Sequence, residues 1–362
     1  MISIAQPLFG DAEKKALIEV LESNILVQGP RVEKFETGFS DYIGTKHAIA
    51  TSSGTTALAV SLMALGVKPG DEVITSPFTF IATASAILLC GAKPVFMDVD
   101  LQTFNIAPEF ITEAITPKTR AIMPVHLYGL PAEMDAISAI AEEHKLVIVE
   151  DACQAHGAKY GDHKVGGIGD AGCFSFYPTK NMATGEGGMI TTKEDTVAEK
   201  CKLIRNHGQQ DRYYYVRWGC NYRMTEFAAA LGNIQLTKLD EFNKKRQENA
   251  KRLSELLEGE VATPVIPANL THVFHQYTIQ LPSEKIRDGL KQHLFDNGIG
   301  SAVYYPLALH EIDFLEGRAV GSMENTKQLT QTVLSLPIHP ALSSDDIDTI
   351  AGEVKAGLKK QG

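Results

Sequence analysis

The chain has 362 residues, with 44 acidic side chains against 34 basic ones, so its formal net charge is −10 at pH 7. Because the basic residues are dispersed and form no run, neither a nucleic acid nor an anionic membrane surface is expected as a partner. The five cysteines are far apart and lack CxxC spacing, which predicts reduced thiols and excludes a disulfide framework. No secretion-signal pattern and no bilayer-length apolar run is present, so we expect a cytoplasmic protein.

Helical patterns come first along the chain. Residues 11–23 and 32–42 place apolar side chains at helical spacing, with a loop at 25–30 between them. From residue 47 onward, short β-branched runs alternate with helical segments, a pattern typical of an α/β fold with a mostly parallel sheet covered by helices. The expected strands are 47–50, 72–76, 93–99, 120–125 and 146–152, and the expected helices are 55–65, 79–89, 108–114 and 132–144.

The last third of the chain has a different character. Residues 225–257 read as helix and are highly charged over more than the usual helix length. We predict a large domain over residues 1–240, a smaller C-terminal α+β domain over 241–362, and an N-terminal segment able to pack on the smaller domain. The expected elements of the smaller domain are strand-like runs at 274–281 and 301–307 and helices at 283–297, 324–334 and 344–358.

One lysine stands in an unusual setting. Lys180 lies in the stretch FSFYPTKNMATGEGGMIT, between turn-prone polar segments within an apolar strand pattern that resumes at 189–192. Burial lowers the pKa of a lysine because its ammonium group loses solvation, and the amine can then attack carbonyls. Ser175 could donate its hydroxyl to an anion, and the glycines after Lys180 let the chain turn tightly beside a ligand. Taken alone, Lys180 could equally be an exposed loop lysine.

A second stretch, TSSGTTAL at residues 51–58, leads from an expected strand into a helix. Ligands in open α/β sheets bind at such strand ends and helix N-termini. Gly54, Thr55 and Thr56 could therefore offer backbone N–H groups and hydroxyls to a phosphate. Ordinary helix N-capping is the alternative for these residues.

A third stretch closes a very apolar strand with Glu150 and Asp151, where a buried carboxylate needs a cationic partner. A lysine, an acid and a phosphate site together match the needs of pyridoxal 5'-phosphate (PLP). This cofactor requires an amine for its aldehyde, an acid against its pyridine nitrogen and an anion site for its phosphate.

Six motifs follow one another in the order TSSGTTAL, SPFTFIATASAI, EDACQAHGA, FSFYPTKNMATGEGGM, RNHGQ and GCNYRMTEFAAALGNIQL. Together they resemble the DegT/StrS family of PLP-dependent keto-sugar aminotransferases, which have the fold type I of aspartate aminotransferase. The resemblance runs from Pro7 to the segment LSLPIHPALS at 334–343. It implies that PLP is the cofactor and that the enzyme is a homodimer with shared active sites.

The resemblance also implies roles for individual residues. Lys180 would form a Schiff base with the cofactor and later move protons, and Asp151 would pair with the pyridine nitrogen. Gln154 would lie near the ring hydroxyl, and Phe80 would stack on the ring. The implied cofactor-phosphate site comprises Thr55, Thr56 and Ser175, beside the N–H group of Gly54 noted above, with Asn221 contributed by the other subunit.

Substrate contacts are implied for four residues. Arg223 would meet a carboxylate of the amino donor or of an acidic sugar, because a guanidinium fork matches a carboxylate; a surface salt bridge is the alternative. Tyr304, Tyr305 and His310 resemble a stretch that reaches the sugar, although the sequence VYYPLALHE departs from the commoner form PLHLQ. No metal site is expected. Three singly placed histidines are expected to be structural hydrogen-bonding residues: His156, His207 and His275.

The implied reaction is a two-stage transamination. Glutamate gives its amino group to the cofactor, and a 3-keto or 4-keto nucleotide-linked sugar then receives it, with Lys180 as the general base. The products of such enzymes usually enter surface polysaccharides, glycans or other amino sugars. The alternatives are a sugar dehydratase of the same fold, in which histidine replaces the lysine, an aminotransferase for a cyclitol or another keto acceptor, and a non-catalytic sensor of PLP or a sugar nucleotide.

Overall fold

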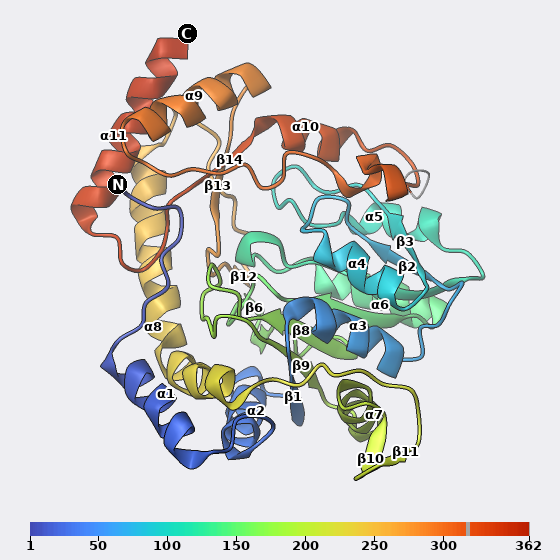
Figure 1. Cartoon of the computed structure of the whole chain (residues 1–362). Coiled ribbons are helices and arrows are strands. Elements are labelled where there is room, and N and C mark those ends of the chain that lie inside the picture. The colour runs from blue at the N-terminus through green and yellow to red at the C-terminus, as the bar shows by residue number, and fades with distance from the viewer. Residues whose placement is uncertain (316–318, 362) are drawn as a thin grey trace.

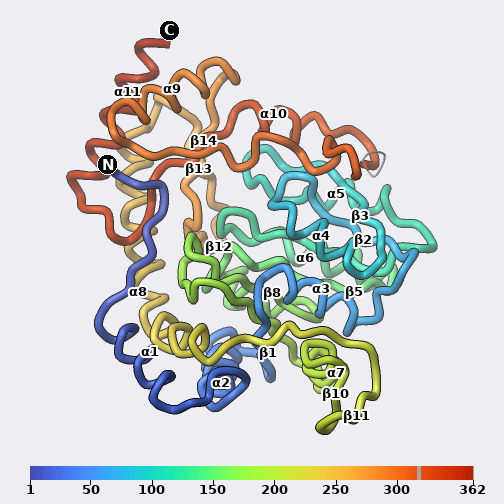
Figure 2. The backbone as a smooth tube through the Cα atoms, viewed as in Figure 1, coloured from blue at the N-terminus to red at the C-terminus, as the bar shows by residue number. Residues whose placement is uncertain are grey.

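The computed structural model describes residues 1–315 and 319–361, and Figures 1 and 2 follow the path of the chain. A seven-stranded sheet with the order β1-β9-β8-β5-β4-β2-β3 forms its centre. Strand β9 runs antiparallel to β1 and β8, and the other neighbouring pairs are parallel, which confirms the expected mostly parallel sheet. The strands are β1 (His47–Thr51), β2 (Glu72–Thr75), β3 (Lys93–Phe96), β4 (Thr119–Met123), β5 (Val147–Asp151), β8 (Ala171–Ser175) and β9 (Gly188–Thr192).

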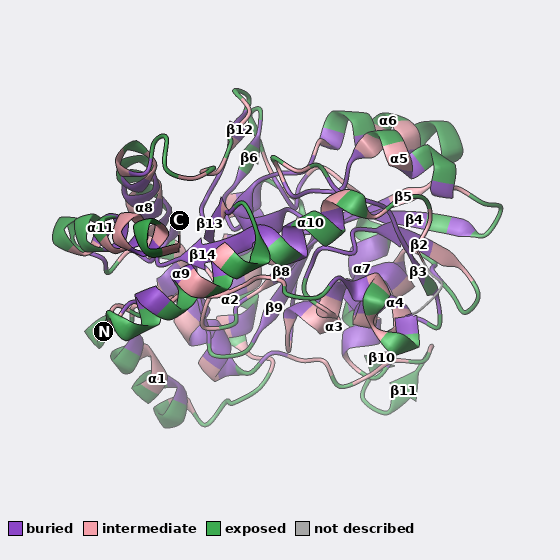
Figure 3. Ribbon diagram, turned by 90° about the horizontal axis from the view of Figure 1, so that it is seen from above, coloured by how far each residue is buried: buried purple, intermediate pink, exposed green. Residues whose placement is uncertain are grey.

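Helices cover both faces of this sheet. Seen from above in Figure 3, the buried strands pass between α5 and α6 on one side and α3, α4 and α7 on the other. Helix α2 packs on β1 and β9 on the same face as α6. The helices are α2 (Pro30–Ile43), α3 (Gly54–Ala64), α4 (Ala82–Leu89), α5 (Pro108–Ile111), α6 (Met134–His144) and α7 (Asp195–Arg205).

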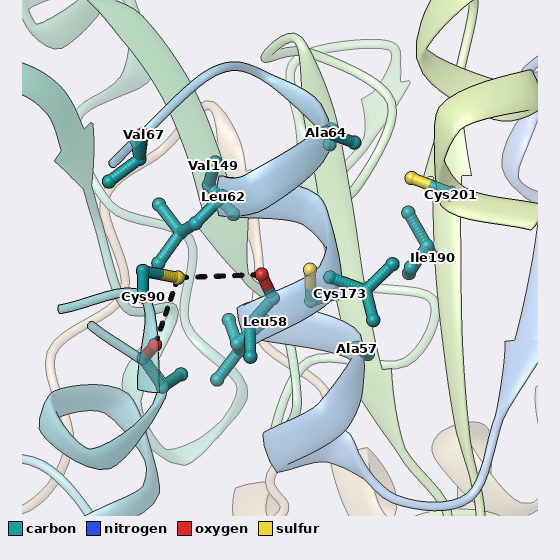
Figure 4. Packing of buried hydrophobic residues seen from close by; sticks show 14 of the residues in the cluster. Ala57, Leu58, Leu62, Ala64, Val67, Cys90, Val149, Cys173, Ile190 and Cys201 are labelled. Carbon is teal, nitrogen blue, oxygen red and sulfur yellow. Dashed lines mark hydrogen bonds between the residues drawn. The ribbon is translucent and has the colours of Figure 1, made fainter. Parts of the chain in front are cut away.

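Helix α3 is apolar all round because it lies between the sheet and two other helices. Figure 4 shows Leu58 and Leu62 of α3 in one cluster with Val149 of β5, and the cluster also contains Cys90 and Cys173. All five cysteines are free thiols. This packing fixes the N-terminal end of α3 against the carboxyl ends of β5 and β8.

A second core lies around the far end of α8 (Glu226–Leu256), a single continuous helix. Leu253 of α8 packs there with side chains from β13 and β14, and Ile2 of the N-terminal segment contacts the same cluster. The predicted boundary at residue 240 falls inside α8, so the division into domains stays a prediction. The other elements of this region are α9 (Glu284–Asp296), α10 (Glu324–Thr332), α11 (Ser344–Gln361), β13 (Tyr277–Gln280) and β14 (Val333–Leu336).

Several expected elements differ in the structure. The expected helix 324–334 ends at Thr332, because Val333 begins strand β14, which pairs with β13. The expected strand at 301–307 is reduced to an isolated bridge between Ala302 and Ser335. Helix α7 and several short elements were not predicted. These short elements are β6 (Lys159–Tyr160), β7 (His163–Lys164), β10 (Gln209–Asp211), β11 (Tyr214–Tyr215) and β12 (Leu270–Thr271).

At the N-terminus, the expected helix 11–23 is confirmed as α1 (Asp11–Ser23). The expected helix 108–114 is divided between α5 and the 3-10 turn η1 (Thr112–Ala114). No helix in the described ranges combines the length and the apolar character needed to span a bilayer.

Candidate active site

A cavity of about 810 Å³ opens at the carboxyl ends of β5 and β8, beside the N-terminus of α3. This is the edge at which the sequence places a ligand site. The cavity brings together most of the predicted site residues, which come from segments far apart in the chain. Its lining includes Gly54, Thr55, Phe80, Asp151, Gln154, Ser175, Lys180, Tyr304 and Tyr305.

Lys180 stands in a turn directly after β8, and its backbone N–H donates to the carbonyl oxygen of Tyr177 at 2.9 Å. Its half-buried side chain lines the cavity. Burial lowers the pKa of Lys180, and the neighbouring Cys153 and Asp151 oppose that shift only in part. The amine is therefore easier to deprotonate than that of an exposed lysine, as a nucleophile or a general base requires.

Asp151 ends strand β5 and lines the same cavity while only 5% exposed. Its Oδ2 accepts a hydrogen bond from the Thr83 hydroxyl at 2.8 Å, and its Oδ1 accepts one from the backbone N–H of Cys153 at 3.3 Å. These two donors fix the orientation of the carboxylate. Asp151 can therefore present a buried negative charge to a ligand at a defined angle.

Glu150 has a different role, because successive side chains of a strand point to opposite faces. Its carboxylate accepts hydrogen bonds from the backbone N–H groups of Gly166, Ile168 and Gly169 at 2.7 to 2.8 Å and lies 3.0 Å from His126 Nε2. Burial alone raises the pKa of Glu150, but the hydrogen bonds from His126 and the amides lower it below its ordinary value. Three of its four hydrogen-bond partners are backbone N–H groups of the loop at 166–169. This loop, rather than a cationic side chain, provides most of the stabilisation that the sequence led us to expect.

The N-terminus of α3 approaches β8 very closely. A Cβ atom on Gly54 would lie 2.7 Å from Ser175 Cβ and 2.9 Å from Cys153 Sγ, so this approach requires glycine. Thr55 lines the cavity, whereas the hydroxyl of Thr56 accepts a hydrogen bond from the Ser53 N–H at 3.0 Å. Thr56 thus serves the helix cap, the alternative weighed for it above.

These residues fit PLP by the chemistry of their groups. Lys180 offers an amine, Asp151 offers an oriented carboxylate, and the first turn of α3 offers N–H groups and the positive end of a helix dipole. Phe80 is 56% exposed and lines the cavity with a flat apolar ring. Because residue 54 is glycine, no side chain occupies the space between the start of α3 and Ser175.

A hydrogen-bonded group of aromatic residues forms another wall. Gln154 Oε1 accepts from the Tyr128 backbone N–H at 2.9 Å, and Gln154 Nε2 donates to the Tyr305 hydroxyl at 3.1 Å. The Tyr128 hydroxyl donates to the carbonyl oxygen of Tyr304. Sequence reasoning missed Tyr128 and Thr83, although Tyr128 follows the carboxyl end of β4, where the strand-end rule could have indicated it.

Besides Thr56, three predicted residues lie outside the cavity lining. Asn221 is exposed, and Arg223 Nη1 donates to Asn206 Oδ1 at 2.7 Å. His310 lies in the 3-10 turn η3 (Leu309–Glu311), where burial lowers its pKa. The roles of these residues stay predictions.

The histidines near the site are neutral. His156 packs between Phe174 and Phe176, with ring centroids 5.4 and 5.7 Å away, and burial lowers its pKa to about 3. Within the described residues its ring nitrogens have no hydrogen-bond partner of regular geometry, although the Ser175 backbone acts on its pKa, so the expected structural role of His156 stays a prediction. His275 lines the cavity, and burial lowers its pKa well below the ordinary value. Across 1–315 and 319–361, no cluster of three or more His, Cys, Asp or Glu side chains could hold a metal ion.

Comparison with known proteins adds three findings. The model of the DegT/DnrJ/EryC1/StrS aminotransferase family matches residues 7–355. A "Pleiotropic regulatory protein" of Geobacillus stearothermophilus is 44% identical over 338 residues, which cover 91% of this chain and 90% of the relative. The UDP-N-acetyl-3-dehydro-alpha-D-glucosamine 3-aminotransferase of Acidithiobacillus ferrooxidans is 40% identical over 342 residues, covering 94% and 92%.

Among solved structures, that of S. venezuelae DesV in complex with a ketimine intermediate matches this chain with a TM-score of 0.92. The two sequences are 36% identical, and the match covers 98% of this chain and 99% of DesV. This likeness confirms the expected fold over nearly the whole chain.

Proposed function

The chain belongs to the DegT/DnrJ/EryC1/StrS aminotransferase family, and from this membership we propose that it moves the amino group of glutamate to a keto group on a nucleotide-linked sugar. The aminotransferases of this family depend on PLP. The observation that carries the proposal is the single cavity lined by Lys180, Asp151 and the N-terminus of α3. The relative named for a UDP-linked 3-dehydro sugar supports the choice of acceptor.

Lys180 and Asp151 would do the chemistry. When bound, PLP supplies an aldehyde that reacts with amines and a ring that delocalises the electrons left on the substrate carbon. Lys180 would hold the cofactor through its amine, and the same amine, when free, would act as the general base that moves the proton from the substrate carbon to the cofactor. Asp151, oriented by the Thr83 hydroxyl, would pair with the pyridine nitrogen and favour its protonated, electron-withdrawing form.

The remaining cavity residues would bind and orient. Thr55 and Ser175 would hold the cofactor phosphate together with the N–H groups of α3, and Gln154 would contact the ring hydroxyl. Tyr304 and Tyr305 form the wall on which we place the sugar. The roles assigned above to Phe80, Arg223 and His310 belong to the same proposal, whereas the Thr56 hydroxyl is engaged in the helix cap.

We further propose a cytoplasmic homodimer in which Asn221 completes the partner's site. The exposed position of Asn221, away from the cavity of its own chain, supports this arrangement. Close to it in sequence, the β10–β11 hairpin and the segment after it expose large aromatic side chains, with Tyr213 of the hairpin 72% exposed and Trp218 beyond it 65% exposed. An apolar patch of this kind is typical of a protein–protein interface.

The test is product formation from isotopically labelled glutamate and a panel of UDP-linked sugars carrying a 3-keto or a 4-keto group. Transfer of the label to one of the sugars by the wild-type protein, and none by Lys180→Ala, is the expected result. Production of a dehydrated sugar without label would favour the dehydratase, and label in Lys180→Ala would contradict the role of the lysine.

A second candidate function is regulation without turnover, because a relative 44% identical to this chain is named a regulatory protein. In that case the protein would bind PLP through Lys180 but would release no 2-oxoglutarate when glutamate is added. The intact set of Lys180, Asp151 and Gln154 in one cavity favours the enzyme.

A further inference from the structure

A buried amide on α8 joins two segments of the cavity wall. Asn243 is 6% exposed and lies on the inner face of α8. Its Oδ1 accepts a hydrogen bond from Asn181 Nδ2 at 2.7 Å, and its Nδ2 donates to the carbonyl oxygen of His156 at 2.8 Å. Asn181 directly follows Lys180, and His156 lies two residues after Gln154. One side chain therefore holds both the lysine segment and the segment that follows Asp151.

We propose that Asn243 is a positioning residue for Lys180, setting the placement of its amine relative to Asp151 and the cofactor ring. The inference rests on the proposed function in that Lys180 is taken as the cofactor-binding lysine. The two segments leave β5 and β8 as loops, which lack the regular hydrogen bonds of a sheet. A fixed link between such loops is needed because proton transfer is sensitive to small displacements of the reacting groups.

The surrounding packing leaves Asn243 little freedom. A Cβ on Gly157, whose φ is +84°, would lie 2.9 Å from Asn243 Nδ2 and 2.4 Å from the Tyr42 hydroxyl oxygen. The backbone after His156 thus approaches the amide as closely as a glycine allows. On the other side, Asn181 Nδ2 also donates to the carbonyl oxygen of Val273 at 2.8 Å, so the lysine segment is tied at two points.

An amide at this position has a cost that an apolar residue of the same size would avoid. A buried polar group is tolerated when its hydrogen bonds are made, and both functional atoms of Asn243 are paired. Both bonds end beside cavity-lining residues. One turn further along α8, Gln247 makes a comparable bond to the carbonyl oxygen of His272, which lies three residues from the nearest cavity-lining residue in the chain, His275.

The experiment compares Asn243→Leu with Gln247→Leu as a matched control on the same helix. In the cofactor-free protein, amide hydrogen exchange should accelerate across residues 180–184 in Asn243→Leu and stay unchanged in Gln247→Leu. In the protein loaded with PLP, the pH at which the Schiff-base absorption band titrates should move for Asn243→Leu alone. Its kcat should fall about 10- to 100-fold with a smaller change in KM, because a displacement near 1 Å can cost about 100-fold in rate.

A second variant guards against failure to fold. Asn243→Ser is smaller, adds no buried charge and cannot span both Asn181 and the His156 carbonyl, so it should show the same direction of change as Asn243→Leu without overpacking. Asn181 and Asn243 are the two partners of one hydrogen bond, so breaking it from either side removes the same link. The double variant Asn181→Leu with Asn243→Leu should therefore be little worse than either single variant.

Wild-type exchange, band titration and kcat in either folded Asn243 variant would overturn the proposal. So would equal effects in the Gln247→Leu control. The exchange measurement needs neither cofactor nor sugar, so it separates this proposal from the proposed function. That function fails instead if Lys180→Ala retains the Schiff-base band.

Discussion

The substitution Gly54→Ala tests the close approach of α3 to β8. The added Cβ would meet Ser175 Cβ at 2.7 Å and Cys153 Sγ at 2.9 Å, and Ser175 Cα lies at 3.3 Å. Because Ser175 belongs to a strand of the central sheet, it cannot move aside without disturbing β8. Overpacking of this kind typically costs about 1–3 kcal/mol. The start of α3 should shift away from the cavity, taking its N–H groups with it.

When the shifted helix start costs the cofactor contacts a similar amount, about 1–3 kcal/mol, PLP should bind about 5- to 150-fold more weakly to Gly54→Ala, since about 1.4 kcal/mol corresponds to tenfold. The assay is fluorescence or absorbance titration of the cofactor-free protein with PLP, together with the thermal midpoint. The control is Gly352→Ala, at an exposed position in α11 where an added Cβ meets nothing within 4 Å. It should stabilise the protein by about 0.5–1 kcal/mol, as Gly→Ala does in helices. Wild-type PLP affinity and stability in Gly54→Ala would refute this reasoning.

Three further predictions concern charge and assembly. Arg246 donates from Nη1 to the Phe274 carbonyl oxygen at 3.0 Å, and burial lowers its pKa to about 10, so it stays charged at neutral pH. Burial and, to a smaller extent, this charge lower the pKa of His275, so Arg246→Met should raise that pKa, seen as a higher midpoint in an NMR titration of the imidazole, and Arg246→Lys should not. His156 has a pKa of about 3 when folded and about 6.5 when unfolded, so it binds a proton only in the unfolded chain as the pH falls below 6.5. Its contribution to stability is lost in that range, by about 2 kcal/mol at pH 5, and His156→Phe should flatten the acid limb of unfolding curves of the cofactor-free protein; an unchanged slope would contradict this. Mixing inactive Lys180→Ala with inactive Asn221→Ala should restore about a quarter of wild-type activity, because each mixed dimer has one intact site; no recovery would argue against a shared site.

The strand-end rule allowed the centre of the site to be predicted from sequence. Asp151 and Lys180 follow neighbouring strands, and Gly54 and Thr55 begin a helix after a third, so the topology of a parallel sheet brings them to one edge. The positions of such residues can be predicted from local sequence pattern, because the pattern indicates both the strand or helix and the residue at which it ends or begins.

Other features depend on partners distant in sequence and could not be predicted in this way. The expected helix at 324–334 continues past Thr332 by pattern, but pairing with β13 makes Val333 the start of a strand. The partners of Glu150 are loop amides at 166–169, which no side-chain pattern reveals. Asn243 lies 62 residues from Asn181, so its link to the lysine segment emerges only from the fold.

The most direct test of the central claim is the absorption spectrum of the PLP-loaded protein before and after glutamate is added. We predict a visible Schiff-base band that is absent from Lys180→Ala, bleaches with glutamate as 2-oxoglutarate is released, and returns when an accepted keto sugar is supplied. A band that persists unchanged in Lys180→Ala, or one that no amino donor bleaches in the wild-type protein, would contradict the account.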